Sequence, residues 1–173
     1  QPWDFNVQEK RDKAEKMVRD KTAILLIGPP MCSAFSQIQT LNRHKMGENK
    51  YQEMLEQGLT HLRFCMKLYN LQRDNGLYFL HEHPKNAKSW EDPTVTQFMG
   101  KWDVETVTGD MCVFGMNQET GDGNMLVMKP TRLMTNAKGI ADRLGKRCNK
   151  RHRHVTLLDG RARAAEVYPE DLC

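Results

Sequence analysis

Apolar residues are distributed along the chain in two patterns, one with helical spacing and one of short continuous runs typical of buried strands. Over 7–20, apolar residues recur at helical spacing in a charged background, which predicts a surface helix with one buried stripe. The stretch TAILLIG at 22–28 is a continuous apolar run that ends at Gly-Pro-Pro, and it predicts a strand buried on both faces. A second run, LYFLHEHP at 77–84, follows a turn signal and stops at a proline, which predicts a second strand.

Between these two strands, 50–74 carries apolar residues along one side of a helix, with Gly58 as a point where the helix could divide in two. Two buried strands joined by a helical crossover form a βαβ unit, whose strands are parallel. Further along, the pattern predicts a helix at 89–100, a strand at 102–110 and a last strand region at 125–135. This alternation predicts an α/β fold with a doubly wound, mostly parallel sheet and helices on both faces.

Charge divides the chain into two parts. The 173 residues include 26 Lys or Arg and 22 Asp or Glu, a net charge of +4. Residues 1–137 balance at zero, whereas 138–163 holds nine basic residues against Asp142 and Asp159, a local charge of +7. We therefore expect an α/β core over 1–137 and a basic, mostly helical part over 138–173 packed on the same domain. The basic segment is either a contact surface for phosphates or a solvated face.

Composition narrows the class of protein. With 39% hydrophobic and 28% charged residues, and no apolar stretch near the roughly 20 residues that a bilayer requires, the sequence predicts no membrane span. Five widely spaced cysteines without a CxxC pair argue against a disulfide framework and indicate a reducing, intracellular compartment. The first residues contain neither an initiating Met nor the apolar core of a signal peptide, so we expect a piece of a longer polypeptide.

Two segments bring reactive side chains to one edge of the predicted sheet, where ligands of open parallel sheets bind. Cys32 follows the first strand close to a helix start, which favours the thiolate, and Glu82 lies at the end of the second strand, where partial burial favours the protonated acid. The alternatives are a packed cysteine and a surface carboxylate. A metal site of Glu82 with His81 and His83 is disfavoured, because strand alternation sends the histidines to the opposite face.

A second group of candidate metal ligands lies in the basic segment. The sequence CNKRHRH places Cys148, His152 and His154 at a Cys-x3-His-x-His spacing, which could supply three zinc ligands. Cys173 or another side chain would be the fourth ligand. Histidines inside a basic stretch also contact phosphates or solvent, and we expect that role here rather than zinc.

The sequences GPPMCSAFS around Cys32 and HEHP around Glu82 occur in the order, and with the intervening helix, of a known pair of catalytic segments. They resemble the proline-cysteine loop, usually GPPCQGFS, and the glutamate-asparagine-valine segment of the cytosine-C5 DNA methyltransferases. GDMCVFGMNQ and RAAEVYPEDLC resemble later segments of that family, and KPTRLM would carry a catalytic arginine at Arg132. More specifically, the pattern resembles the divergent methyltransferase-like modules of eukaryotic retroelement polyproteins.

Several residues depart from the family pattern. Met31 stands in place of the second proline of Pro-Pro-Cys, Ser33 replaces glutamine, and His83 replaces asparagine. The sequence contains no F-x-G-x-G loop for S-adenosylmethionine and no acidic strand end for its ribose. The resemblance therefore implies a Rossmann-like, methyltransferase-type sheet that is incomplete at its N-terminus.

The resemblance also implies a mechanism and partners. Cys32 would add to C6 of a flipped cytosine, Glu82 would donate to N3, and C5 would then take the methyl group of S-adenosylmethionine. Arg132 would be a third catalytic residue, and Pro30 and Ser36 would contact the cofactor. The expected partners are DNA or RNA in the nucleus and other domains of a polyprotein, with no membrane. The alternative is a catalytically inactive nucleic-acid-binding module of a retrotransposon-type polyprotein.

Overall fold

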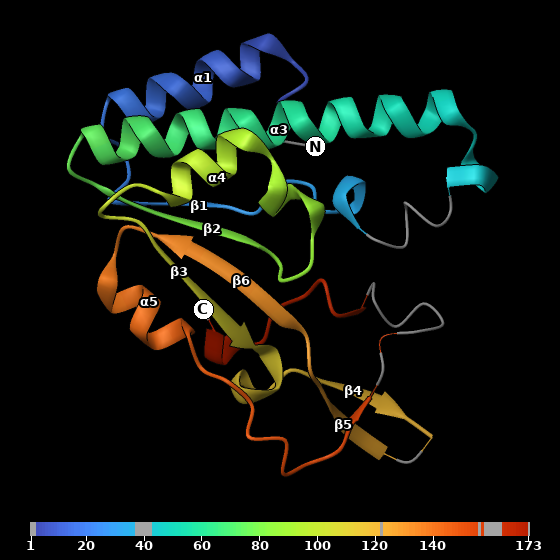
Figure 1. The fold of residues 1–173 in the computed structure, drawn as a ribbon. Coiled ribbons are helices and arrows are strands. Elements are labelled where there is room, and N and C mark those ends of the chain that lie inside the picture. Colours follow the sequence, from blue (N-terminus) through green and yellow to red (C-terminus); the bar gives the residue numbers. More distant parts are fainter. Residues whose placement is uncertain (1–2, 37–42, 122, 156, 158–163, 173) are drawn as a thin grey trace.

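The computed structural model describes residues 3–36, 43–121, 123–155, 157 and 164–172, which form two small sheets with helices around them (Figure 1). The larger sheet has the strand order β1-β2-β6-β3. Its strands are β1 (Leu25–Gly28), β2 (Tyr78–Pro84), β3 (Glu105–Asp110) and β6 (Pro130–Thr135). The smaller sheet has the order β4-β5-β7, formed by β4 (Asn117–Thr120), β5 (Gly123–Val127) and β7 (His154–Val155).

The larger sheet is not the mostly parallel, Rossmann-like sheet that the sequence pattern predicts. β1 and β2 are parallel, but β6 lies between β2 and β3 and runs antiparallel to both. In the smaller sheet, β4 and β5 are antiparallel, and β5 and β7 are parallel. The prediction is wrong because the apolar region 125–135 forms two strands, β5 and β6, which belong to different sheets. Pro130 begins β6, as expected for a residue without an N–H for a continuous ladder.

The helices cover the larger sheet from both sides (Figure 1). The first group lies over β1 and β2 and consists of α1 (Gln8–Arg19), α3 (Glu48–Asp74) and α4 (Pro93–Met99). α5 (Lys138–Leu144) lies on the opposite side, against β3 and β6. The helices predicted at 7–20 and 50–74 are confirmed, and Ala14 and Val18 form the buried stripe of α1. From residue 138 onward the described elements are α5, β7 and a 3-10 turn at Glu170–Leu172.

The main core lies between the larger sheet and α3. The ring of Tyr69 stacks on that of Phe79 with centroids 4.8 Å apart, and Phe98 meets Phe79 edge to face at 5.3 Å. The prediction that the first strand is buried on both faces is wrong, because β1 is an edge strand and Ile27 is 58% exposed. Within the described part of the chain, no helix has the length and apolar character needed to cross a membrane.

Gly58 does not divide the long helix α3, which is continuous through that residue. A Cβ atom at Gly58 would lie 2.6 Å from the Cβ of Ala34. Ala34 and Phe35 are buried within the 3-10 turn Ser33–Phe35 that directly follows Cys32. The glycine therefore lets the loop of residues 29–36, which carries Cys32 and is called the cysteine loop below, pack directly against α3.

Replacing Gly58 by alanine is expected to destabilise the protein. Overpacking a core contact costs about 1–3 kcal/mol, which exceeds the helix-propensity gain of about 1 kcal/mol from glycine to alanine. The matched control is Gly139→Ala in α5, where an added Cβ meets nothing within 4 Å. We expect that control to raise the free energy of unfolding in chemical denaturation, whereas Gly58→Ala lowers it. An equal gain in both variants would contradict the packing role of Gly58.

Candidate functional site

The parallel pairing of β1 and β2 brings Cys32 and Glu82 to the same edge of the larger sheet. Gly28, the last residue of β1, pairs with His81, so the loop after β1 passes beside the last three residues of β2. Cys32 is exposed, and it is close enough to Glu82 for the charge of the carboxylate to act on the thiol. The strand pairing therefore puts the two residues at the ends of neighbouring strands, with the charge of Glu82 acting on the Cys32 thiol.

His83 ties the cysteine loop to β2. Its imidazole is fully buried, with Nε2 2.8 Å from the Pro30 carbonyl oxygen and Nδ1 bonded to the hydroxyl of Ser89. Because a carbonyl oxygen only accepts, Nε2 carries the proton and Nδ1 accepts from Ser89. Burial lowers the pKa of His83 to about 4, so this neutral form is the one present at neutral pH.

Tyr69 fastens the start of the same loop from α3. Its hydroxyl donates to the Gly28 carbonyl oxygen at 2.6 Å and lies 3.2 Å from Nδ1 of His81. A Cβ at Gly28 would lie 2.2 Å from that hydroxyl oxygen, so the close approach requires glycine. His81 is fully buried, and burial lowers its pKa well below the usual value. Both histidines of the HEH segment therefore serve as neutral core residues on the α3 side.

Glu82 points to the other face of the sheet, as strand alternation predicts. Its Oε1 atom is buried and has no hydrogen-bond partner among the described residues. Burial raises the pKa of Glu82, against the opposing effects of a hydrogen bond from Tyr168 and the charge of Lys129. An unpaired buried carboxyl oxygen carries a free-energy cost, which a ligand that bonds to it would remove.

Lys129 and Tyr168 complete the site, although the sequence pattern did not single them out. Lys129, between β5 and β6, donates from Nζ to the Tyr168 hydroxyl and to the Ala165 carbonyl oxygen, both at 3.0 Å. Burial lowers the pKa of Lys129, while the charges of Glu82 and Cys32 favour its protonated form. Burial and Glu82 raise the pKa of Tyr168. Both residues lie in motifs that resemble family segments, but spacing did not show which side chain reaches the site.

Arg132, predicted as a catalytic residue, does not join Cys32 and Glu82. It pairs in register with His83 on β2, so the two side chains share the face opposite Glu82. Its guanidinium carbon lies 5.1 Å from the centre of the Trp90 ring. Lys129, three residues earlier, supplies the cation beside the Cys32 and Glu82 pair.

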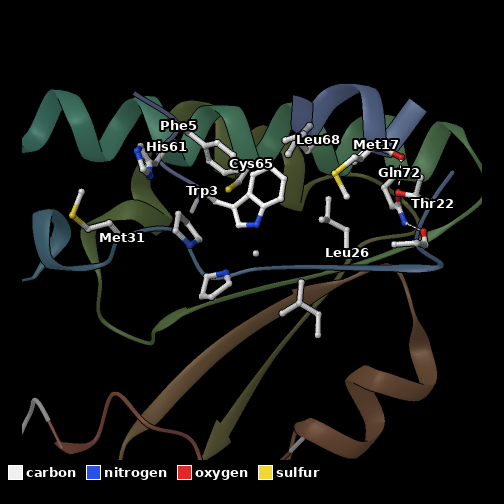
Figure 2. A pocket seen from close by; sticks show the side chains of 17 residues that line it. Trp3, Phe5, Met17, Thr22, Leu26, Met31, His61, Cys65, Leu68 and Gln72 are labelled. Atoms are coloured by element: carbon white, nitrogen blue, oxygen red, sulfur yellow. Dashed lines mark hydrogen bonds between the residues drawn. The ribbon is translucent and has the colours of Figure 1, made fainter. Parts of the chain in front are cut away.

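A cavity of about 460 Å³ lies between β1, α1 and α3, and Glu82 is not among the residues that line it (Figure 2). Its wall is mainly apolar and includes Trp3, Phe5 and Pro30, one of the two predicted cofactor contacts. Ser36, the other predicted contact, is not part of that wall. Among the described residues that line the cavity, the polar side chains are Thr22, His61 and Gln72.

These lining residues do not fit S-adenosylmethionine. That cofactor carries a positive sulfonium, an ammonium group and ribose hydroxyls, whereas no described residue of the cavity wall is a carboxylate. The amide of Gln72 already donates to the Ala23 carbonyl oxygen at 2.8 Å. The Thr22 hydroxyl donates to the Met17 carbonyl oxygen at 2.9 Å. The described residues of the cavity wall therefore suit an apolar group and do not form a methyl-donor site in this cavity.

The candidate zinc ligands of the basic segment come together in space. Cys148, His152 and His154 form one cluster, and Cys112, which the sequence pattern did not assign, joins them as a fourth member. Cys173, the predicted fourth ligand, lies outside the described residues.

No family model matches this chain, and no curated protein or solved structure compared with it matches either. The function is therefore inferred from the chemistry of these side chains.

The charges around Cys32 predict opposite effects of two substitutions on its thiol. Glu82→Gln removes a negative charge and should lower the pKa of Cys32, whereas Lys129→Gln removes a positive charge and should raise it. The measurement is the rate of Cys32 alkylation by iodoacetamide against pH, followed by peptide mass spectrometry. The exposed Glu119→Gln on β4 is the control and should leave the profile unchanged. Identical profiles in all the variants would contradict this arrangement.

Protonation of His83 predicts that acid weakens the fold. Its pKa is about 4 in the folded protein and 6.5 as the reference value, so the unfolded chain binds more protons between these values. The free energy of unfolding should fall by about 3 kcal/mol as the pH drops through this window, and level off below it. The pH dependence of the free energy of unfolding is measured by denaturant titration in the wild-type chain and in His83→Gln. The difference between the two gives the contribution of His83 apart from those of Glu82 and His81. An unchanged pH dependence in the variant would contradict the assignment.

Proposed function

We propose that the chain binds a flipped cytosine of a nucleic acid and adds the Cys32 thiolate to C6 of the base, with Glu82 as the acid at N3. The observation that supports this most directly is the buried, unpaired Oε1 of Glu82 beside the exposed thiol of Cys32. A cytosine ring presents C6 and N3 as an electrophilic carbon and a basic nitrogen, which suit a thiolate and a carboxylic acid.

The protonation of Glu82 links the two groups. Although Cys32 is exposed as a residue, desolvation of its sulfur by the surrounding chain raises its pKa, and the charge of Glu82 raises it further, while Lys129 lowers it. An ionised Glu82 therefore holds the free site in its thiol form. Burial also raises the pKa of Glu82, which favours the protonated acid. Once Glu82 is neutral, its charge no longer opposes the thiolate, and Lys129 remains as the stabilising cation. The same proton thus prepares both the acid and the nucleophile.

In the proposed step, the thiol proton leaves to solvent and the sulfur forms a bond to C6. The electron pair of the ring double bond shifts toward C5 and N3, and N3 takes the proton of Glu82. The resulting enamine can accept a proton from water at C5. Loss of a proton from C5 to solvent, return of the N3 proton to Glu82 and elimination of the Cys32 sulfur, which regains its proton from solvent, restore the cytosine. The cycle therefore exchanges the C5 hydrogen with solvent.

A nucleic-acid substrate is supported by the exposed cations between α5 and β7. Lys146, Arg147, Lys150, Arg151 and Arg153 are all exposed. Such residues contact phosphates without reading sequence, while the base must leave its stack to reach a thiol. We propose DNA or RNA as the polymer that carries the cytosine.

Transfer of a methyl group to C5 is the outcome that the family resemblance implies. Since the wall of the cavity between β1, α1 and α3 does not fit S-adenosylmethionine, we derive no step through that cofactor. The exposed cations favour a second candidate function, a nucleic-acid-binding module that does not methylate.

Hydrogen exchange at C5 tests the adduct without a methyl donor. The protein is incubated in D2O with an oligonucleotide containing cytosine, and deuterium at C5 is measured by mass spectrometry of the nucleosides. We expect exchange with the wild-type chain and a loss of at least about a hundredfold in Cys32→Ser and Glu82→Gln. Ser33→Ala, which removes a hydroxyl from the same exposed loop, is the matched control and should retain exchange.

The same experiment separates the two candidate functions. Binding of the oligonucleotide without exchange in the wild-type chain would reject the adduct and favour the binding module. Exchange that persists in Cys32→Ser would place the chemistry elsewhere.

A further inference from the structure

Four side chains with metal-binding atoms converge beside the smaller sheet, away from the Cys32 and Glu82 site. Cys112 comes from the 3-10 turn Met111–Phe114 after β3, Cys148 and His152 come from the loop after α5, and His154 begins β7. One sulfur or nitrogen atom of each lies within 4.8 Å of the others. The cluster thus joins residues that are up to 42 positions apart in the sequence, from Cys112 to His154.

The spacing within the cluster is that of a tetrahedral metal site. Zinc binds sulfur at about 2.3 Å and imidazole nitrogen at 2.0–2.1 Å, so a regular tetrahedron separates a sulfur from a nitrogen ligand by about 3.5 Å. The sulfur of Cys148 lies 3.4 Å from Nε2 of His152 and 3.5 Å from Nε2 of His154. Both imidazoles therefore direct the same ring nitrogen toward the space that a shared ion would occupy.

We propose that Cys112, Cys148, His152 and His154 form a structural zinc site. Two thiolates and two imidazoles in a closed tetrahedral set are the ligands that zinc takes in structural sites. This inference does not depend on the proposed cytosine chemistry, because it shares no residue with that site.

The backbone around Cys148 is shaped for a sulfur that accepts hydrogen bonds. The Lys150 N–H donates to the Cys148 sulfur at 3.2 Å, and Lys150 has a positive φ of 58°, an uncommon conformation for a residue other than glycine. This turn bends the loop so that His152 returns toward Cys148. The rings of His152 and His154 lie side by side, with their centroids 4.5 Å apart.

Asp110, the last residue of β3, forms hydrogen bonds with the loop that carries Cys148. One carboxylate oxygen accepts the Cys148 N–H at 2.8 Å and the Arg147 Nε–H at 2.9 Å. The carboxyl group is almost fully buried, and its charge lies close enough to His154 to act on that ring. Asp110 thus fixes the backbone of one ligand and places a negative charge beside a site for a cation, as carboxylates around metal ligands do.

A zinc ion would connect the two parts of the chain and orient the basic loop. Cys112 belongs to the core over 1–137, and the other three ligands belong to the basic part that follows. Lys150, Arg151 and Arg153 alternate with the ligands along the loop and are exposed. Because the metal would fix the ligands on either side of these cations, the cations would face solvent in a defined arrangement.

Metal content and cobalt spectroscopy test the site on the whole chain. The protein purified under reducing conditions and loaded with Zn²⁺ should retain one equivalent after dialysis, as measured by elemental mass spectrometry. Co²⁺ in place of zinc should give the visible bands of a tetrahedral ion and a thiolate charge-transfer band in the near ultraviolet. Chelation should lower the melting temperature.

The variants Cys148→Ser and His152→Ala should lose the retained zinc and the tetrahedral cobalt spectrum. Their matched controls, Cys32→Ser and His44→Ala, change an exposed cysteine and an exposed histidine outside the cluster and should keep both. His152 is not among the buried residues, so its replacement leaves the core intact. Failure of the wild-type chain to retain zinc, or equal retention in all the variants, would overturn the proposal. A disulfide between Cys112 and Cys148 in the reduced preparation would overturn it as well.

Discussion

The register between β1 and β2 is the constraint on which the cysteine loop depends. Gly28 pairs with His81, and this places Pro30 within hydrogen-bond distance of His83 and Cys32 near Glu82. Because side chains alternate along a strand, a shift of β2 by one residue would turn Glu82 into the core and His83 out of it. The aromatic core opposes that shift, since Phe79 and His81 are fully buried on the same face of β2.

The two faces of β2 have separate roles in the site. The face toward α3 carries two neutral histidines that bond to the loop and to Tyr69, and burial keeps them uncharged. The opposite face carries Glu82, whose environment is completed by residues distant in sequence. Lys129 and Tyr168 supply a cation and a hydroxyl there, so the C-terminal residues cover the acid that β2 presents.

The end of β3 is the second place where distant segments meet. Asp110 lies at the end of that strand, bonds to the loop after α5, and is followed by Cys112 of the cysteine and histidine cluster. In the cysteine and histidine cluster, the core supplies Cys112 and the C-terminal part supplies the other three ligands. In the Cys32 and Glu82 site, the C-terminal part supplies Tyr168. The basic part is therefore structurally joined to the core, and its exposed cations lie on the same body as the Cys32 loop.

The sequence by itself determined the elements of the first half of the chain and the reactive groups that they carry. Helical spacing located α1 and α3, apolar runs located β1 and β2, and strand alternation separated Glu82 from His81 and His83. The rule for ligands at strand ends also brought Cys32 and Glu82 to one edge. Only the tertiary structure decided the antiparallel direction of β6, the choice of Lys129 over Arg132 as the nearby cation, and the addition of Tyr168 and Cys112. Local periodicity records which face of an element is buried, but it carries no information on which distant strand becomes its neighbour or in which direction that strand runs.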